Sequence, residues 1–205
     1  MEGTGPYDRL YQNSNLLWPD RPGRMVKEAA SLRSEGRALD VGCGDGKNLA
    51  YLERLGWIVD GIDVSSIAIE AARRRLRESQ IRHRGTLALA NVTSADFGTA
   101  TYDLVVCYGL YHCLTDAGVE KAQATLVRAL RPGGLFAFAV FNNDLPVPPD
   151  HCTDGLILRP ADHLPGLLCS WRRIALETGQ IEESHPPLVG LHRHALTWGL
   201  FERSR

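Results

Sequence analysis

The sequence has no excess of charge of either sign and few cysteines. Its 205 residues carry 23 Lys and Arg against 24 Asp and Glu, which gives a formal net charge of -1. General attraction to a polyanion needs a cationic surface, so the balance predicts neither a nucleic-acid partner nor an anionic membrane partner. The five cysteines are odd in number and include no C-x-x-C pair, which disfavours a disulfide framework and a paired zinc motif. We therefore expect a reducing, cytoplasmic location.

Long apolar runs and targeting signals are also missing. No stretch approaches the about 20 apolar residues that cross a bilayer, and the first 20 residues lack a basic region followed by an apolar one. No repeat, low-complexity tract or polar linker divides the chain, so we expect one domain over residues 1–205. Within it, residues 1–36 are expected to form a lead or lid carrying Tyr7, Tyr11 and Trp18. Residues 142–168, rich in proline at the start, are expected to form an insert on the substrate side.

Short apolar segments alternate with helical patterns through the first 141 residues. Strands are expected at 38–41, 57–62, 87–90, 102–108 and 135–141, and helices at 22–36, 49–56, 67–76 and 119–130. Near the end we expect a short helix at 162–168 and strands at 171–178 and 194–201 that pair antiparallel. Strands without polar alternation belong in a sheet that is covered on both faces. The pattern therefore predicts an α/β domain with a mostly parallel sheet.

A glycine-rich turn joins the first strand to the next helix. Its sequence, Asp40-Val41-Gly42-Cys43-Gly44-Asp45-Gly46, reads G-x-G-x-G, whereas a dinucleotide fingerprint would need glycine where Lys47 stands. Asp63 ends the second strand, about 20 residues after the glycine-rich turn. An acid at this separation along the chain can accept hydrogen bonds from both hydroxyls of a ribose. Asp40 can meet an ammonium group. The pattern favours a ligand with a ribose and an amino-acid moiety, against the alternative of a turn that only packs strand on helix.

Four segments over residues 36–141 carry a family resemblance. ALDVGCGDGKNLAYL, GWIVDGIDVS, YDLVVCYGLYHCL and LRPGGLF resemble, in order and spacing, the class I (Rossmann-like) S-adenosylmethionine-dependent methyltransferases. The resemblance implies a three-layer sandwich with a mostly parallel seven-stranded sheet whose last strand is antiparallel. It also implies S-adenosyl-L-methionine as cofactor. It assigns the methionine part of the cofactor to Asp40, Gly42, Cys43 and Gly44. It assigns the ribose to Asp63 and the adenine to Val64.

One position departs from the family pattern. Where the family usually has an acid after the third strand, this chain has Asn91 followed by Val92. The Asn91 side-chain carbonyl can accept a hydrogen bond from the adenine amino group, and the Val92 backbone can contact the ring edge. The alternative is an asparagine that only caps a turn.

Residues after the fourth strand are expected beside the methyl donor. Tyr108 and Tyr111 either shape the pocket or belong to the core, and His112 is either a general base or a packed histidine. Methyl transfer from a sulfonium mainly requires alignment of the nucleophile, and a base is needed only when the nucleophile must lose a proton.

A second candidate cluster lies near the end of the chain. His192, Arg193 and His194 are expected just before the last strand, where two proton carriers and a planar cation suit an oxyanion or carboxylate substrate. The alternative is a solvated strand edge. The short N-terminal lead, the segment Gly46 to Leu52 and Leu191-His192-Arg193 resemble the tellurite-resistance-type methyltransferases. The resemblance implies a compact site for thiols or chalcogen oxyanions, with catalytic roles for His192 and Arg193. His151 and Cys152 have no spaced partners, so no metal site is expected.

A run of arginines and the overall composition complete the prediction. The run from Arg73 to Arg77 and the segment 82–84 are interpreted as a solvated helix face rather than an RNA-binding surface. We expect a methyltransferase acting on an oxygen, nitrogen, carbon or sulfur (chalcogen) nucleophile of a small molecule, as a monomer or homodimer. The alternative is a non-catalytic protein that binds the cofactor or a partner with the same fold.

Overall fold

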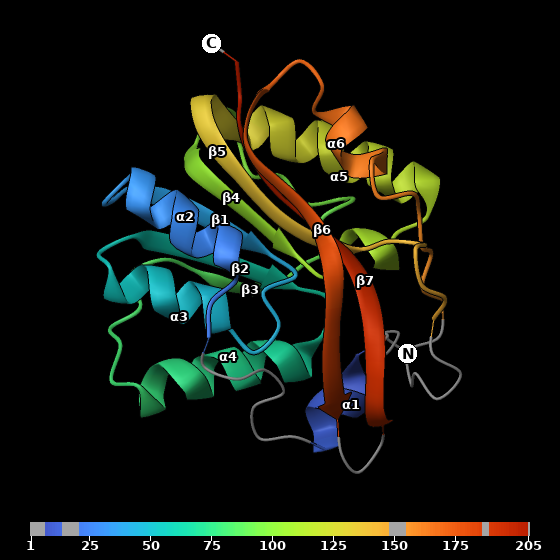
Figure 1. The fold of residues 1–205 in the computed structure, drawn as a ribbon. Helices are drawn as coiled ribbons and strands as arrows, with labels where there is room; N and C mark the ends of the chain where they lie inside the picture. The colour runs from blue at the N-terminus through green and yellow to red at the C-terminus, as the bar shows by residue number, and fades with distance from the viewer. Residues whose placement is uncertain (1–6, 14–20, 148–154, 186–188, 205) are drawn as a thin grey trace.

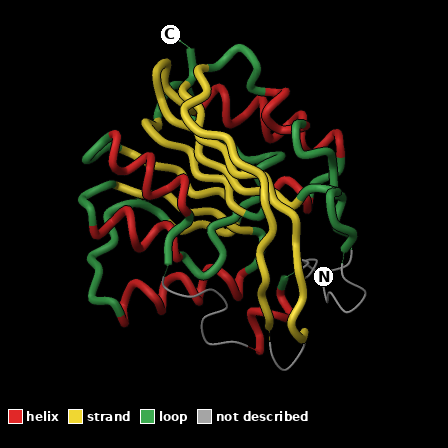
Figure 2. The backbone as a smooth tube through the Cα atoms, viewed as in Figure 1, coloured by secondary structure: helices red, strands yellow, loops and turns green. Residues whose placement is uncertain are grey.

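A seven-stranded sheet runs through the molecule between two layers of helices (Figure 1; Figure 2). The computed structural model describes residues 7–13, 21–147, 155–185 and 189–204. In chain order the elements are α1 (Asp8–Asn13), α2 (Arg24–Leu32), β1 (Arg37–Val41), α3 (Lys47–Arg54), β2 (Ile58–Asp63), α4 (Ser66–Glu78), β3 (Leu87–Leu89), β4 (Tyr102–Tyr108), the 3₁₀ helix η1 (Tyr111–Cys113), α5 (Asp116–Ala129), β5 (Leu130–Phe141), α6 (His163–Leu167), β6 (Arg172–His185) and β7 (Val189–Glu202).

The strand order is β3-β2-β1-β4-β5-β7-β6. The pairs from β3 to β5 are parallel, whereas β7 runs antiparallel to both β5 and β6. The predicted fold class, a mostly parallel seven-stranded sheet with an antiparallel last strand, is confirmed. Because β1 pairs with both β2 and β4, the chain reverses its direction of winding at β1. In such sheets a crevice forms at this point, outside the carboxyl ends of the strands.

Two apolar clusters hold the helices against the sheet. On one face α2, α3 and α4 pack their apolar sides, including Met25, Leu49 and Leu76, against the strands. On the other face α5 and the segment around α6 bury Leu126 and Leu164. Figure 1 shows these two groups of helices on opposite sides of the sheet. Both faces of the central strands are therefore apolar, as their sequence predicts. No helix among the described residues is long and apolar enough to cross a membrane.

Side chains cap the two longest helices where the sequence allows it. The Ser65 hydroxyl accepts a hydrogen bond from the backbone N–H of Ala68 at the start of α4, and Thr115 does the same for Gly118 at the start of α5. Such caps satisfy backbone donors that have no partner within the helix. They therefore set where α4 and α5 begin, beside the ends of β2 and β4.

The last two strands are longer than the sequence predicts. β7 pairs with β5 only from Leu196 to Glu202, but it pairs with β6 back to Val189. The expectation that His192 and Arg193 precede the last strand is therefore wrong, because both lie within β7. Figure 1 shows β6 and β7 running on together past the rest of the sheet. Local sequence could not indicate this extension, since β6 and β7 pair there with each other and not with β5.

The insert at 142–168 is tied down beside η1. Arg159 donates to the carbonyl oxygens of Tyr111 and Leu114, at 3.0 and 2.7 Å, and forms an ion pair with Asp116 at 2.8 Å. The Ile157 N–H donates to the His112 carbonyl oxygen at 2.8 Å. Residues 148–154, with His151 and Cys152, lie outside the described residues.

Candidate functional site

A cavity of about 990 Å³ opens at the carboxyl ends of β1, β2, β4 and β5. This volume is at the upper end of the about 300–1,000 Å³ that small-molecule sites usually have. The cavity lies at the point where the winding of the sheet reverses, and α1, the start of α2 and the β6–β7 pair also border it. No described residue of the 142–168 insert borders it, so the structure does not support a substrate-side position for that part of the insert.

The glycine-rich turn is held open by its own backbone conformation. Gly42, Gly44 and Gly46 have positive φ angles of 67°, 55° and 79°, which residues with side chains rarely adopt. The Gly44 N–H donates to Asp63 Oδ2 at 2.9 Å, and the Ser65 N–H donates to Asp63 Oδ1 at 2.9 Å. Burial raises the pKa of Asp63, although these backbone donors oppose the rise. The turn and the end of β2 thus present one oriented carboxylate to the cavity.

A buried ion pair fixes the same turn to α4. Arg75 Nη2 lies 2.9 Å from Asp45 Oδ2, and Arg75 Nε donates to the Asp45 carbonyl oxygen at 2.9 Å. Arg75 is 2% exposed, so the interpretation of the basic run as a solvated face is wrong for this residue. The physical reason is that position 75 lies on the inner side of α4, where a guanidinium is tolerated because it has an acidic partner.

Asp40 lies behind the turn rather than on the cavity wall. Its side chain is buried, and burial raises its pKa to about 7 although the Lys47 ammonium opposes the rise. Asp40 Oδ2 has no hydrogen-bond partner among the described residues. Lys47 itself borders the cavity, and burial lowers its pKa. A cationic ligand group near the turn would therefore stabilise the charged form of Asp40.

The predicted adenine side is partly rearranged. Val64 and Val92 both border the cavity, Val64 with an exposed side chain and Val92 with a buried one. Asn91 borders it too, but its Oδ1 accepts from the Thr93 N–H and the Thr93 hydroxyl, both at 2.9 Å. Two donors occupy both lone pairs of this oxygen, so the structure favours the turn-capping role over the predicted bond to adenine.

Tyr108 connects β4 to the start of α2. Its hydroxyl accepts a hydrogen bond from the Met25 N–H at 2.9 Å, and its ring packs against Gly23, where a Cβ would lie 2.2 Å from the ring. The Asn48 side chain accepts from the Gly23 N–H at 2.8 Å. Tyr108 therefore shapes the cavity by anchoring α2, and burial raises its pKa well above the usual range for tyrosine. Tyr111 belongs to the core.

His112 is buried in η1 beside the cavity. Its Nδ1 accepts a hydrogen bond from the Phe141 N–H at 3.1 Å, so in the neutral ring the proton is on Nε2. Nε2 faces the Tyr7 hydroxyl at 3.3 Å. In this tautomer His112 is a hydrogen-bond donor toward the cavity and not a general base. Tyr7 and Tyr11 border the cavity as a lid would, whereas Trp18 lies outside the described residues.

Strand alternation separates the three residues of the His192 cluster. His192 and His194 point to one side of β7, where Glu183 of β6 lies 3.8 and 3.4 Å from their Nε2 atoms. Arg193 points to the other side, is mostly exposed and pairs with Glu182 at 3.1 Å. The predicted grouping of Arg193 with His192 is therefore not formed, because neighbouring residues of a strand face opposite ways.

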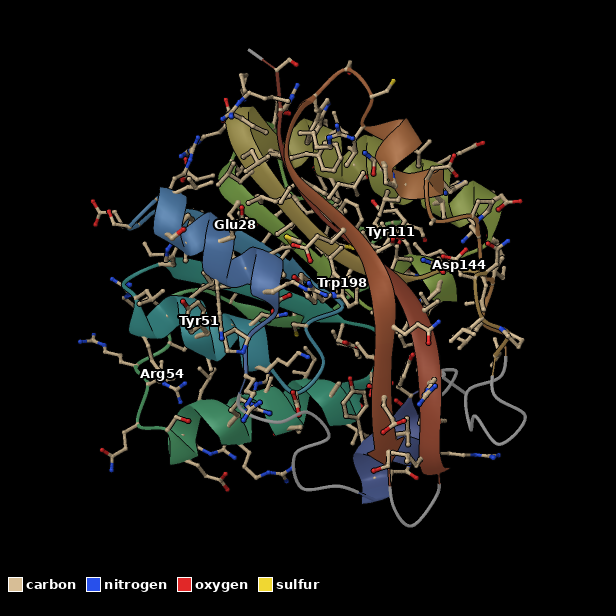
Figure 3. The ribbon with its side chains drawn as sticks, viewed as in Figure 1. Glu28, Tyr51, Arg54, Tyr111, Asp144 and Trp198 are labelled. Atoms are coloured by element: carbon tan, nitrogen blue, oxygen red, sulfur yellow. The ribbon has the colours of Figure 1, made fainter. Side chains whose placement is uncertain are left out.

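Aromatic rings connect this strand pair to the rest of the site. The Phe141 ring is stacked between His112 and His194, at centroid distances of 4.2 and 4.0 Å. Trp198 of β7 also borders the cavity, and the Arg24 guanidinium of α2 lies 3.8 Å from its ring centroid. Figure 3 shows Trp198 between α2 and the β6–β7 pair.

Several residues of the site were not predicted. Lys47 and Asn48 follow the glycine turn directly, so their position at the start of α3 was a usable signal. Glu183 and Trp198 carried no such signal, because their place depends on the register of β6 and β7.

Cys43 and Cys107 are buried free thiols whose pKa values burial raises, and no disulfide occurs among the cysteines in the described ranges.

Comparisons with known proteins match this architecture. A family model described as a methyltransferase domain matches residues 38–134. The chain is 38% identical over 110 residues to the ubiquinone biosynthesis O-methyltransferase of Burkholderia ambifaria, which covers 53% of this chain and 46% of that protein. The chain thus spans about half the length of the curated relatives that it matches.

Two solved structures share the fold. TehB from Haemophilus influenzae superposes with a TM-score of 0.75 at 19% identity, covering 87% of this chain and 61% of that one. The 1,6-didemethyltoxoflavin-N1-methyltransferase of Burkholderia thailandensis, solved with S-adenosylhomocysteine, gives a TM-score of 0.63 at 20% identity, covering 89% and 79%. At such identities the likeness concerns the fold.

Proposed function

We propose that this chain is a class I methyltransferase that transfers the methyl group of S-adenosylmethionine to a small molecule. The match of residues 38–134 to a methyltransferase domain and the O-methyltransferase relatives support this. The observation that carries the proposal is the hydrogen bond from the Gly44 N–H to Asp63 at 2.9 Å. It joins the glycine turn to an acid at the end of the neighbouring strand, within a cavity at the switch point of the sheet.

The residues on the turn side fit this cofactor. Asp63 uses one backbone N–H on each carboxylate oxygen, which leaves lone pairs for the ribose hydroxyls. Gly42, Cys43 and Gly44 let the methionine part approach the backbone closely. The buried Asp40 supplies a negative charge for the ammonium group. The bound cofactor would supply an electrophilic sulfonium methyl group.

Val64 and Val92 provide an apolar setting for the adenine on the same side. Val64 is 49% exposed, so a planar ring lying against it would bury apolar surface. Because Asn91 Oδ1 already holds two Thr93 donors, adenine selectivity rests on backbone groups near Val92 in this proposal.

The acceptor is proposed to lie between His112, Phe141 and the β6–β7 pair. The cavity is large enough for a second small ligand, and its wall there combines apolar and aromatic side chains with the polar residues His112, Glu182, Glu183 and Ser184. His112 donates from Nε2, so it orients an acceptor through a lone pair of the acceptor. The O-methyltransferase relatives make an oxygen nucleophile the first to test, with nitrogen, carbon and sulfur nucleophiles next. The narrower tellurite-resistance type stays a prediction.

The proposal extends to the working form of the protein. We propose a single catalytic domain over residues 1–205, active as a monomer or homodimer in the cytoplasm, without a nucleic-acid or membrane partner. The basic segments support this, since Arg75 is paired internally and His83 and Arg84 both face Glu53, at 3.0 and 3.7 Å. Cations neutralised in this way contribute little to phosphate binding.

Titration calorimetry with S-adenosylmethionine and with S-adenosylhomocysteine tests the cofactor, and a panel of small hydroxyl, amine and thiol acceptors tests turnover. We expect saturable binding of both cofactor forms and formation of S-adenosylhomocysteine with at least one acceptor. Failure to bind either form would reject the methyltransferase function. Binding without turnover across the panel would favour the non-catalytic alternative.

A further inference from the structure

We propose that Glu183, His192 and His194 form a site for a divalent transition metal of the Zn²⁺ class. Among the described residues these three bring one carboxylate oxygen and two imidazole nitrogens within 4.8 Å of one another. A carboxylate and two neutral imidazoles are all electron-pair donors. Two histidines and one carboxylate, with a further position open to ligand, make up a common catalytic metal site.

The strand pair positions the three side chains. Glu183 on β6 lies directly opposite His192 on β7, and His194 follows His192 by two residues on the same face. Directly opposed residues of antiparallel strands have adjacent side chains, and residues two apart share a face. The arrangement therefore follows from the register and needs no loop to hold it.

Two of the three separations are close to those of metal ligands, and the set of three atoms lies within 4.8 Å, so the two histidine rings must move toward each other to hold one ion. With metal–nitrogen and metal–oxygen bonds of about 2.0–2.2 Å, neighbouring ligand atoms of a tetrahedral site lie about 3.4 Å apart. His194 Nε2 lies 3.4 Å from Glu183 Oε1, and His192 Nε2 lies 3.8 Å from the same oxygen. The second distance exceeds a normal hydrogen bond and requires a shift of only a few tenths of an ångström to suit a metal.

The tautomer of His192 supports metal binding. Its Nδ1 lies 2.8 Å from the Gly190 carbonyl oxygen, so Nδ1 carries a proton and donates it to that acceptor. In the neutral ring Nε2 then has a lone pair that faces Glu183. A backbone carbonyl that fixes the other ring nitrogen is the usual outer partner of a metal-bound histidine.

The site is connected to the acceptor side of the cavity. Glu183 borders the cavity, and the His194 ring is separated from His112 by the Phe141 ring alone. Glu183 also attracts the Lys47 ammonium, the cation with which the metal would share this carboxylate.

The role of the metal rests on the proposed function. A hydroxyl or thiol acceptor that coordinated the metal would lose its proton more readily, because the cation stabilises the resulting anion. In that step the O–H or S–H bond breaks, its electron pair stays on the coordinated atom, and the proton passes to water. His112 cannot remove this proton in its present tautomer, so the metal would supply the missing activation.

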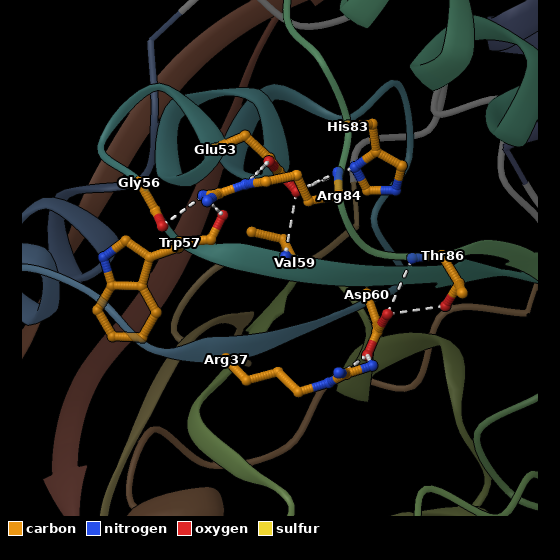
Figure 4. A network of polar contacts seen from close by, with 9 residues as sticks. All are labelled: Arg37, Glu53, Gly56, Trp57, Val59, Asp60, His83, Arg84 and Thr86. Carbon is orange, nitrogen blue, oxygen red and sulfur yellow. Dashed lines mark hydrogen bonds and ion pairs between the residues drawn. The ribbon is translucent and has the colours of Figure 1, made fainter.

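Metal titration of the full chain tests the site. The protein is first treated with EDTA, and the chelator is removed. We then expect calorimetry to show that one equivalent of Zn²⁺ binds. We also expect bound Co²⁺ to give the strong visible absorption bands that are typical of four- or five-coordinate Co²⁺. Glu183→Gln and His192→Gln should each weaken binding by at least about tenfold. His83→Gln is the matched control, because His83 also pairs with a glutamate, Glu53, in a network with Arg84 and no second histidine (Figure 4).

The outcomes separate the metal site from the proposed function. Zn²⁺ affinity that is equal in the wild type, Glu183→Gln, His192→Gln and His83→Gln would overturn the site, and so would binding well below one equivalent. Circular dichroism and S-adenosylhomocysteine binding show whether each variant is folded. Loss of metal binding with intact S-adenosylhomocysteine binding supports the site. A wild-type protein that binds Zn²⁺ but not S-adenosylhomocysteine would retain the site and reject the methyltransferase function.

Discussion

The two sides of the cavity are built in different ways. The proposed cofactor side, made of the turn at Gly42–Gly46 with Asp63, Val64 and Val92, comes from three short segments at or just after the ends of β1, β2 and β3, and hydrogen bonds from backbone N–H groups orient its carboxylate. The proposed acceptor side, with His112, Phe141 and Glu183 on the cavity wall and His192 and His194 behind Glu183, gathers side chains from η1, β5, β6 and β7. The first side depends on local conformation, the second on the pairing of distant strands. Changes in the acceptor side could therefore alter which substrate binds while the cofactor side stays the same.

The largest expected effect concerns the attachment of the turn. Arg75→Ala removes the buried guanidinium that pairs with the Asp45 carboxylate, which should lower the free energy of unfolding by about 3–5 kcal/mol. Urea denaturation measures the change. The control is Arg73→Ala on the same helix, whose exposed pair with Glu70 should be worth less than about 1 kcal/mol. Similar small losses in both variants would mean that the turn does not depend on this pair.

The next effect tests the carboxylate of the cofactor side. Asp63→Ala removes the acceptor for the Gly44 N–H and the proposed acceptor for the ribose hydroxyls, so S-adenosylhomocysteine binding should weaken by about 1–3 kcal/mol. Calorimetry gives the dissociation constants. Asp96→Ala, which removes a carboxylate from an exposed pair with Arg128, should leave binding unchanged. Unaltered affinity in Asp63→Ala would remove this residue from the site.

A smaller effect tests the acceptor side. His192→Ala removes one ligand of the proposed metal site and should lower turnover by about tenfold, because losing a residue that holds or orients a metal typically lowers activity by at least that factor. The affinity for S-adenosylhomocysteine should be unchanged. Steady-state kinetics and calorimetry separate the two quantities. Arg193→Ala changes the adjacent residue, whose side chain faces solvent, and should leave turnover as it is. Equal losses of turnover and affinity in His192→Ala would mean a structural role.

The smallest effect comes from Asp40. Its pKa is raised from 3.8 to about 7 in the free protein, so a ligand ammonium that favours the carboxylate should release a proton on binding below about pH 7. Affinity should rise with pH and level off above that value, and calorimetry in two buffers of different ionisation enthalpy counts the proton. Asp40→Asn should remove the dependence. A wild type that releases no proton would separate Asp40 from the ligand.

The same shift has a consequence for stability. Between about pH 4 and about pH 7 the folded protein holds a proton on Asp40 that the unfolded chain has released, so stability should fall as pH rises through this window. Thermal unfolding of the wild type and of Asp40→Asn across this range compares the two slopes.

Most of the sheet could be predicted because its signals are local. Buried parallel strands appear as short apolar runs, and glycines and caps mark where helices begin, as at Gly46 and Ser65. The glycine turn and Asp63 lie within 24 residues of one another, on two neighbouring strands whose order follows from the usual crossover. The family resemblance points to the same residues, the glycine turn and Asp63.

The remaining parts of the site could not be predicted because they depend on pairing or burial. The length of β6 and β7 beyond β5 is set by mutual hydrogen bonds, which decided that His192 joins Glu183 and that Arg193 does not. The inner position of Arg75 on α4 depends on where the turn places Asp45. The hydrogen bonds that Asn91 and His112 accept come from Thr93 and Phe141, and the sequence alone does not indicate these pairings.

By itself, the sequence determined the α/β class, the resemblance to methyltransferases, and the turn and acid on which the cofactor proposal rests. These follow from residues that act on their immediate neighbours: glycines that permit positive φ, apolar runs that demand burial, and a carboxylate at the end of a strand. Only the tertiary structure decided which histidine is a donor, which arginine is buried and which side chains line the cavity. Those properties are set by contacts between residues far apart in the chain, whose energies exist only once the sheet has closed its register.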